Sequence, residues 1–387
     1  MIENNKGEKM IGKYVAVTGF FGTGSSAIID LLKEYDGVNI ASPVSTDYEH
    51  MALYSNGAFF DLASKLLSPY RSVYGSDLAI NDFILAAKRL NNIDFGWYGG
   101  YKKHYGDLYM NSVNEFISSI SEIKPGRTAA HCIGIRFSLV KALLQIGAKI
   151  LYKRPITVLG RKYIYDGLPS YYSMPTKAEF TNAAKEYISK YLIMCSKKGD
   201  INIFDHLLWP QQANCIDDFF PDNFRLIIVI RDPRDVFLLN KNYWFKPPVA
   251  SPKSKPYFPT ESSKFCEEWL RIMPEQITSK KVLLVQFEDL IYQYDSTKTR
   301  IEDFLEINSK DHIKKFKYFN PQKSIENTQI HLLMDDWKKE VQPLYEKLNN
   351  YIYKYPYERV PNKNLWFDTE LQLDAVNKKS KKTTNKE

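Results

Sequence analysis

The chain has 387 residues, of which 44% are hydrophobic and 25% charged. This length allows one large domain or two ordinary ones, and the composition is that of a globular protein, not a disordered one. The net charge of +8 suits an anionic ligand, but charge alone does not separate a nucleotide from a nucleic acid or an acidic polymer. No nucleic-acid-binding motif accompanies the charge, so we expect no nucleic-acid partner.

No sequence feature predicts export, a membrane span or a bound metal. The first residues lack an apolar signal core, and no run of about 18 apolar residues occurs. The cysteines Cys132, Cys195, Cys215 and Cys266 are widely scattered and form no C-x-x-C pair. Free thiols fit a reducing compartment, so we expect a cytoplasmic protein. Its abundant Lys, Asn, Ile and Tyr suggest an AT-rich bacterial genome.

The chain opens with the pattern of a βα unit. A buried strand is predicted over residues 14–18, followed by a glycine-rich turn and a helix over residues 26–34. Residues 38–40 are expected to be the next strand, reached by a right-handed crossover. Residues 50–125 are predicted to alternate helical stretches with aromatic-rich loops.

Later segments continue the alternation of strands and helices. A strand is predicted over residues 148–158, and a helix over residues 177–195, where apolar residues recur with helical spacing. Residues 224–230 (FRLIIVI) form the strongest strand, with the near-continuous apolar run of a central parallel strand covered on both faces. A further strand is predicted over residues 282–287 and a helix over residues 297–305.

This alternation predicts an α/β fold with a central parallel sheet flanked by helices, of the P-loop nucleotide-binding type. We expect one domain over residues 10–370, with helical insertions around residues 50–125 and 160–220. Residues 371–387 are expected to be a disordered basic tail.

Residues 19–26 (GFFGTGSS) match the glycine frame of a phosphate-binding loop, G-x-x-x-x-G. The glycines let backbone N–H groups point inward, and the following helix adds its dipole and unpaired N–H groups. Ser25 and Ser26 can add hydroxyl donors. Ser25 stands where nucleoside-triphosphate hydrolases carry lysine, so ordinary NTP hydrolysis is not expected. A glycine-rich turn without a ligand is the alternative interpretation.

A second motif, RDPRDV at residues 231–236, directly follows the strongest strand. The carboxyl ends of parallel strands face ligand crevices, and an arginine there can hold a phosphate through two hydrogen bonds. Asp232 followed by Pro233 is a helix-start signal. An ion pair between Arg231 and Asp235 is the alternative interpretation of the arginine.

Together these motifs resemble the sulfotransferases that use 3′-phosphoadenosine-5′-phosphosulfate (PAPS), in a form similar to bacterial carbohydrate sulfotransferases. The likeness is spread over most of residues 14–330 and is poor in detail over residues 50–220. In that family the first loop binds the 5′-phosphosulfate, and PAP is the product. The resemblance implies that five loop residues contact the 5′ side: Gly22, Thr23, Gly24, Ser25 and Ser26. It also implies that Arg231 contacts the 3′-phosphate and that residues 319–328 resemble the loop covering the nucleotide.

The sequence departs from the family at two positions. The family usually carries Lys or Arg two residues before the last glycine of the loop, where this chain has Gly22. It usually has a serine eight residues after the strand-end arginine, where this chain has Leu239. Asn240 is a candidate for the missing donor, and Lys153 or Arg154 for the missing cation. The family's basic group helps to stabilise the leaving phosphate, so Gly22 bears on catalysis more than on binding.

Sulfuryl transfer to a hydroxyl depends on positioning, electrostatic stabilisation and a general base, and in principle needs no metal. By resemblance, many glycan-acting members place a Glu or His after the second strand, where residues 45–50 read STDYEH. Glu49 is the first candidate base, with His50 and Asp47 behind it, although Glu49 could equally cap or decorate a helix. His131 is another candidate, against the alternative of a buried core histidine.

The resemblance implies transfer of a sulfuryl group from PAPS to a hydroxyl of a small-molecule or glycan acceptor, with a carbohydrate as the acceptor class that the family suggests. Aromatic residues of the middle region, among them Trp97 and Tyr98, are candidates for a sugar-stacking surface, with packing as the alternative. One alternative function is a kinase-like P-loop enzyme, which would need a Mg²⁺ site. The other is a non-catalytic nucleotide-binding protein of the same fold.

Overall fold

The structure is a computed structural model. It describes residues 12–44, 48–124, 156–158, 161–163, 170–244, 259–273 and 276–363.

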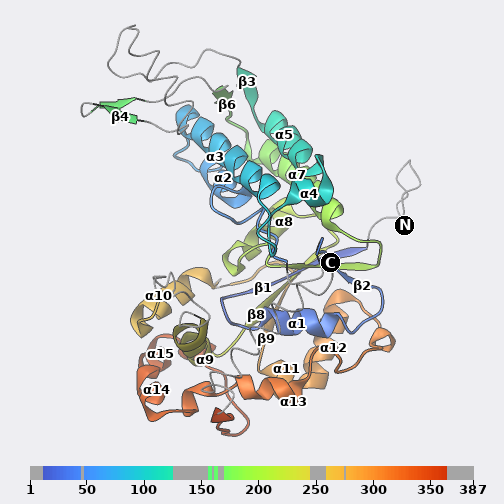
Figure 1. The fold of residues 1–387 in the computed structure, drawn as a ribbon, viewed down its shortest axis with the longest axis vertical. Helices are drawn as coiled ribbons and strands as arrows, with labels where there is room; N and C mark the ends of the chain where they lie inside the picture. Colours follow the sequence, from blue (N-terminus) through green and yellow to red (C-terminus); the bar gives the residue numbers. More distant parts are fainter. Residues whose placement is uncertain are drawn as a thin grey trace.

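A five-stranded sheet with only parallel pairs forms the centre of the protein (Figure 1). Its strand order is β2-β7-β1-β8-β9. In chain order the strands are β1 (Lys13–Gly19), β2 (Val38–Ile40), β7 (Ile201–Asp205), β8 (Phe224–Ile230) and β9 (Val282–Gln286). The predicted α/β class with a central parallel sheet is confirmed.

The strand order creates a topological switch between β1 and β8. From β1 the chain passes to β2 and β7 on one side, and afterwards to β8 and β9 on the other. In open parallel sheets, ligands bind outside the carboxyl ends of the strands at such a switch. The loop after β1 and the RDPRDV motif after β8 therefore meet at the expected place for a ligand.

The first face of the sheet is covered by α1 (Ser25–Leu32) and α12 (Tyr294–Leu305). Side chains alternate across a strand, so Val15 and Val17 of β1 face these helices while Tyr14 and Ala16 face the opposite side. The helix α1 buries its apolar stripe against this face. Strands covered on both sides require the continuous apolar runs that the sequence shows at β1 and β8.

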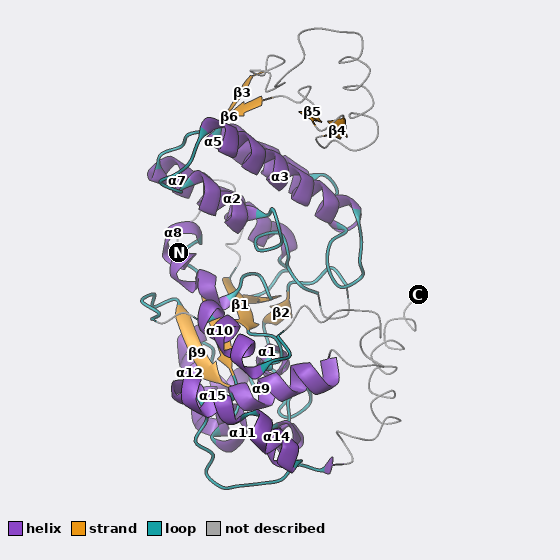
Figure 2. Ribbon diagram, turned by 90° about the vertical axis from the view of Figure 1, so that its left-hand side faces the viewer, coloured by secondary structure: helices purple, strands orange, loops and turns teal. Residues whose placement is uncertain are grey.

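A lobe of helices covers the other face (Figures 1 and 2). Its members are α2 (Phe59–Leu66), α3 (Val73–Asn92), α4 (Tyr101–Tyr105), α5 (Leu108–Ile120), α7 (Lys177–Cys195) and α8 (Ile216–Phe219). The bounds of α7 are those predicted, and a capping box between Thr176 and Glu179 opens this helix. The helical insertion expected around residues 160–220 is interrupted by β7, which belongs to the central sheet.

Among the described residues, two short pairs of strands lie outside the central sheet. β3 (Glu122–Lys124) pairs antiparallel with β6 (Ser170–Tyr172), and β4 (Ile156–Val158) pairs antiparallel with β5 (Arg161–Tyr163). Of the strand predicted over residues 148–158, only β4 falls within the described residues.

The C-terminal part of the chain packs beside the sheet around a third apolar cluster. Phe20, Phe237 and Trp269 are among its buried members. The helices here are α9 (Pro233–Leu239), α10 (Ser262–Ile272), α14 (Asp335–Glu340) and α15 (Gln342–Lys347), with the short α11 (Asp289–Tyr292) and α13 (Pro321–Ser324) nearby. Because Phe20 lies in the loop after β1, this cluster also anchors that loop.

Within the described residues, no helix has the length and apolar character needed to cross a bilayer. Cys195, Cys215 and Cys266 are free thiols. Cys132 and the predicted tail at residues 371–387 lie outside the described residues.

Candidate functional site

The loop after β1 has the backbone shape of an anion-binding turn. Gly22 and Gly24 adopt φ values of 82° and 89°, in the left-handed region that glycine reaches without strain. Between them, buried Thr23 donates both its hydroxyl and its backbone N–H to the carbonyl oxygen of Phe20, at 2.8 and 3.1 Å. Thr23 thus closes the turn, and in this conformation its two donors face the protein.

The loop leads directly into the N-terminus of α1. Gly24 is the N-cap, no side chain caps the helix, and the first turn carries no acidic residue. The first backbone N–H groups of a helix have no intrahelical acceptor, and the helix dipole adds partial positive charge there. Ser25 and Ser26 occupy the first two helical positions. The N-terminus of α1 therefore suits a phosphate group.

The loop leaves no room for a side chain at its glycines. A Cβ atom on Gly24 would lie 2.7 Å from the ring of Phe287, and one on Gly22 would lie 3.1 Å from Leu239 and 3.3 Å from Asn240. The basic residue that the family usually carries at the position of Gly22 would have to combine this crowding with positive φ. The backbone conformation and the close packing at this position thus favour glycine over a basic residue.

Arg231 joins the two motifs. Its side chain is buried, with one terminal nitrogen donating to the carbonyl oxygen of Gly22 at 2.8 Å and the other to that of Asn327. Its guanidinium also lies over the ring of Phe287, 5.1 Å from the centroid. The Nε–H is buried and has no acceptor in the described part of the chain. Arg231 therefore fixes the loop at residues 19–26, which we call the phosphate loop, to residues 319–328, and its buried Nε–H is one donor that remains for a ligand.

The ion pair considered between Arg231 and Asp235 is absent among the described residues. Arg234 pairs instead with Asp232, whose carboxylate also caps α9 by accepting the N–H of Arg234. The Nδ1 atom of His331 lies 3.0 Å from a carboxylate oxygen of Asp235. The pKa of Asp235 is lowered, so this carboxylate accepts the hydrogen bond from the imidazole. The carboxylates of the RDPRDV motif thus face inward.

Asn240 supports the loop. Its amide donates to the carbonyl oxygens of Phe21 and Val236, at 2.8 and 2.9 Å. Both amide hydrogens are thereby used, so Asn240 offers a phosphate no donor in this conformation. The candidate cations Lys153 and Arg154 lie outside the described residues.

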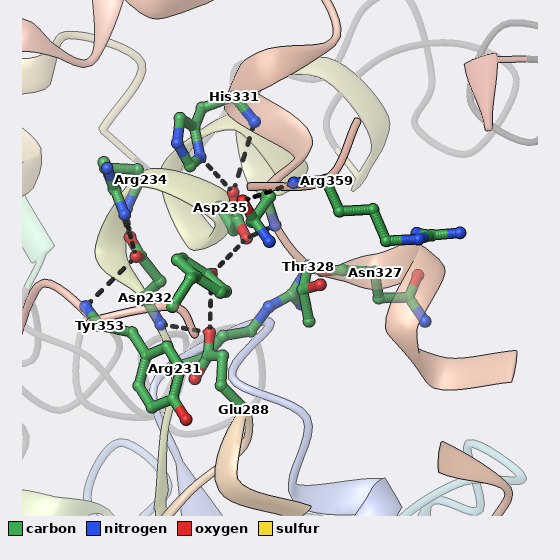
Figure 3. Close-up of polar contacts among 12 residues, drawn as sticks. Arg231, Asp232, Arg234, Asp235, Glu288, Asn327, Thr328, His331, Tyr353 and Arg359 are labelled. Carbon is green, nitrogen blue, oxygen red and sulfur yellow. Dashed lines mark hydrogen bonds and ion pairs between the residues drawn. The ribbon is translucent and has the colours of Figure 1, made fainter. Parts of the chain in front are cut away.

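Figure 3 shows the polar network behind Arg231. Asp235 accepts the N–H of Gln329 at 2.6 Å, and Asp232 accepts that of Tyr353 at 3.3 Å. Glu288 is fully buried and accepts the N–H of Asp232 at 2.9 Å. These contacts attach the C-terminal segment to the end of β8, and so hold Asn327 within reach of Arg231.

Burial and the negative charge of Asp232 together raise the pKa of Glu288 to about 8, against the opposing effects of the hydrogen bond from the Asp232 N–H and of the charge of Arg231. Glu288 is therefore largely protonated near neutral pH. It is the group in this network whose proton is expected to be lost on mild alkalisation.

A cluster of acid and base groups lies at the neighbouring strand end. Glu49 forms a parallel bridge with Asp205, the last residue of β7. His206 follows, with φ of 46°, and its N–H donates to the carbonyl oxygen of Val17 in β1. The Nδ1 atom of His206 lies 2.6 Å from a carboxylate oxygen of Asp205. A histidine in the left-handed region, oriented by a carboxylate, is a pattern of functional sites.

Burial by itself would lower the pKa of His206. The charge of Asp205 and its hydrogen bond outweigh burial, with a smaller contribution from Glu49, and the pKa is raised. Tyr54 donates to Glu49 at 3.2 Å. The cluster therefore combines a histidine of raised pKa with two carboxylates.

Trp209 connects this cluster with the phosphate loop. Its ring lies 5.0 Å from that of Phe21, 5.4 Å from that of Tyr54 and 6.3 Å from that of His206, measured between centroids. The carbonyl oxygen of Trp97 accepts the N–H of Glu49, and the Trp97 side chain is 48% exposed. Aromatic rings thus adjoin the acid–base groups, where a flat or cyclic acceptor could pack.

The candidate bases predicted from the sequence lie in different environments. Glu49 belongs to the cluster. His50 is fully buried, its ring nitrogens contact the carbonyl oxygen of Ala41 and the hydroxyl of Tyr191, and burial lowers its pKa to about 4. His50 is thus a neutral core residue. Asp47 and His131 lie outside the described residues.

Sequence reasoning missed Asp205 and His206 because it missed β7. A signal was present: the short run INIF at residues 201–204, apolar except for Asn202, is followed at once by Asp and His. Polar residues directly after a buried parallel strand are positioned at the ligand edge of the sheet. Among the residues the structure describes, no group of three or more metal-ligating side chains lies together.

Comparisons with known proteins give only distant likenesses. No protein-family model and no curated protein matches the chain. Similar solved structures include the sulfotransferase STF9 from Mycobacterium avium, with 12% identity, a TM-score of 0.33, and coverage of 91% of this chain and 79% of that one. They also include the sulfotransferase domain of the Synechococcus PCC 7002 olefin synthase, with 13% identity, a TM-score of 0.32 and coverage of 99% of both chains. Likenesses this low do not identify an activity or a ligand.

Replacing Glu288 by Gln is expected to flatten the dependence of stability on pH. Because the native state keeps a proton that the unfolded state loses near pH 4.5, the wild-type free energy of unfolding falls as pH rises from there towards about 8. This group contributes up to about 1.4 kcal/mol per pH unit, which the variant lacks. Denaturant unfolding across this pH range measures the slope. Glu267→Gln, at an exposed helix position, is the matched control, and equal slopes for Glu288→Gln and wild type would contradict the assignment.

Proposed function

We propose that this chain transfers a sulfuryl group from PAPS to a hydroxyl group, with a carbohydrate as the acceptor class suggested by the family resemblance. The observation that carries the proposal is the placement of three parts at one edge of the sheet. The phosphate loop and buried Arg231 meet at the switch between β1 and β8, and the Asp205–His206 pair lies at the adjoining end of β7.

The residues present fit the phosphate groups of the donor. The N-terminus of α1 would hold the 5′-phosphate through backbone N–H groups, with Ser25 and Ser26 adding hydroxyls. The buried, unpartnered Nε–H of Arg231 suits an anionic oxygen. When bound, PAPS supplies an activated sulfuryl group on its 5′-phosphate.

His206 fits the role of general base. In its neutral form it can take the proton of an acceptor hydroxyl, and the carboxylate of Asp205 then stabilises the imidazolium and keeps the ring oriented. Glu49, held by Tyr54, adds negative charge that favours the protonated ring. Glu49 thus acts beside the base in this proposal, and His206 takes the role first considered for Glu49.

The two alternative functions make different demands. A kinase-like enzyme needs a Mg²⁺ site and a cation for the β- and γ-phosphates, and the loop carries no lysine. A non-catalytic nucleotide-binding protein would not need the Asp205–His206 pair or the strained backbone of His206. That pair is the feature that favours catalysis over binding alone.

Calorimetry with PAP, ADP and ATP, each with and without Mg²⁺, tests the donor site. We expect PAP to bind most tightly and independently of metal, because a 3′-phosphate adds charged hydrogen bonds of about 1.5–3 kcal/mol each. Arg231→Ala should lower the PAP affinity by a similar free energy. Preference for ATP with Mg²⁺ would favour the kinase-like alternative, and binding of none of the three would remove the proposal.

Gly24→Ala is expected to abolish PAP binding in the folded protein. The new Cβ would combine positive φ with a 2.7 Å contact to Phe287, so the loop must move away from its anion-binding shape. Gly96→Ala is the matched control, because Gly96 has a φ of 82° with nothing within 4 Å of the added Cβ. Titration with PAP, after circular dichroism has shown that both variants fold, compares them. Equal PAP affinities would show that the loop does not bind phosphate.

His206→Gln is expected to lower transfer by roughly 10²- to 10⁴-fold while PAP affinity is retained. The rate of the wild type should rise with pH through a His pKa above the ordinary value, because only the neutral ring accepts a proton. Asp205→Asn should move this rise to lower pH. PAP release with a panel of simple glycosides measures transfer, and His104→Gln in the helical lobe is the control. A wild-type pH profile in His206→Gln would exclude His206 as the base.

A further inference from the structure

The connection from α12 to α13 lies at the end of the sheet away from the phosphate loop (Figure 1). α1 begins at the phosphate loop, and Glu34, just beyond its last turn, contacts this connection. Lys13 at the start of β1 donates to the carbonyl oxygen of Leu305, the last residue of α12, at 2.9 Å. Both contacts place the connection at the amino edge of the sheet, opposite the candidate site.

Glu34 fixes the shape of this connection. The Glu34 side chain is fully buried and accepts the backbone N–H groups of Phe316, Tyr318 and Phe319 at 2.8–3.0 Å. The ring of His312 lies 2.7 Å from the same carboxylate. Such charged hydrogen bonds are among the stronger ones in proteins. The loop is thus held in one conformation, at the expense of a left-handed Phe316 with φ of 62°.

The fixed loop presents apolar and basic side chains together to solvent. We call residues 310–318 the basic loop. Ile313 is 61% exposed, Phe316 43% and Tyr318 45%. In the stretch 313–318 (IKKFKY) three of the six residues are lysine, and no acidic residue interrupts it. Exposed apolar side chains gathered on a rigid loop mark an interaction surface more often than scattered ones do.

The positive charge of the basic loop is not neutralised within the described structure. Its four lysines are exposed, and none forms an ion pair with a described residue: Lys310, Lys314, Lys315 and Lys317. The loop itself contains one acid, Asp311, and exposed acids near it include Asp36 and Asp295. The loop therefore keeps an excess of positive charge directed at solvent.

We propose that the basic loop docks on an anionic lipid bilayer. Lysines beside an anionic membrane gain electrostatic free energy, while exposed aliphatic and aromatic side chains enter the boundary between headgroups and acyl chains. Ile313 favours lipid over single-stranded nucleic acid, because base recognition relies on stacking rings and Ile313 has none. A loop already ordered by Glu34 loses little conformational entropy on docking.

Docking through this surface leaves the candidate site open. The phosphate loop and the basic loop lie at opposite ends of α1. The proposal does not depend on which nucleotide the phosphate loop binds, and it adds a peripheral membrane contact to a chain whose described helices do not span a bilayer.

Co-sedimentation of the full chain with phosphatidylcholine vesicles, with and without phosphatidylserine, tests the proposal. We expect binding only to the phosphatidylserine vesicles, weakening as salt is raised. The triple variant Lys314→Ala/Lys315→Ala/Lys317→Ala should bind on the order of 100-fold more weakly, since each lysine near an anionic surface contributes about fivefold. The variant Phe316→Ser/Tyr318→Ser should also bind more weakly although its charge is unchanged.

The matched control removes the same charge elsewhere. Lys88, Lys102 and Lys280 are exposed and form no ion pair with a described residue, so Lys88→Ala/Lys102→Ala/Lys280→Ala should bind vesicles like wild type. Equal losses in the two triple variants, or no vesicle binding by wild type, would overturn the proposal. Loop-dependent binding to a homopolymeric RNA without vesicle binding would also overturn it, and would assign the surface to nucleic acid. Unfolding curves of each variant identify any loss caused by misfolding.

Discussion

The parallel register of β1 with both of its neighbours positions every part of the candidate site. Val17 of β1 is opposite Asp205 of β7, and Gly19 is opposite Val229 of β8. The phosphate loop, the Asp205–His206 pair and Arg231 all follow within a few residues of these pairs. A shift of one residue in either pairing would turn the strand over, so that side chains packed against α1 and α12 would face the helical lobe instead.

The RDPRDV motif contributes mainly by holding other segments in place. Arg231 binds backbone carbonyl groups of the phosphate loop and of residue 327, while Asp232 and Asp235 accept hydrogen bonds from the C-terminal segment. A buried carboxylate left without these donors would cost several kcal/mol, so the segment and the motif stabilise each other. The motif therefore couples the order of the covering segment to the order of the phosphate loop.

The sequence predicted those strands and helices whose own residues carry a clear apolar pattern. Strong apolar runs predicted β1 and β8, and helical spacing predicted α7 with its observed bounds. β7 has only five residues and a less regular pattern, and its place between β2 and β1 is settled by pairing that no local signal reveals. The neighbourhood of Glu49 and His206 was unpredictable for the same reason, since it depends on a bridge between residues 49 and 205.

The contrast between His50 and His206 shows that burial alone does not determine the charge state of a histidine. Both residues lie near a strand end, but His50 sits among tyrosines and apolar residues, where its charged form is disfavoured. His206 keeps a carboxylate beside one ring nitrogen, so its charged form is favoured despite burial.

The absence of a lysine from the phosphate loop shifts electrostatic stabilisation to the backbone. Positive φ at Gly22 and Gly24 turns the chain so that it enters α1 without a side-chain cap, leaving N–H groups and the helix dipole for an anion. In the proposed reaction, backbone dipoles held by Arg231, Thr23 and Asn240 would need little reorganisation when charge develops on the leaving phosphate. The three side chains that bind the loop from behind thus serve its electrostatics indirectly, through the fixed direction of its peptide groups.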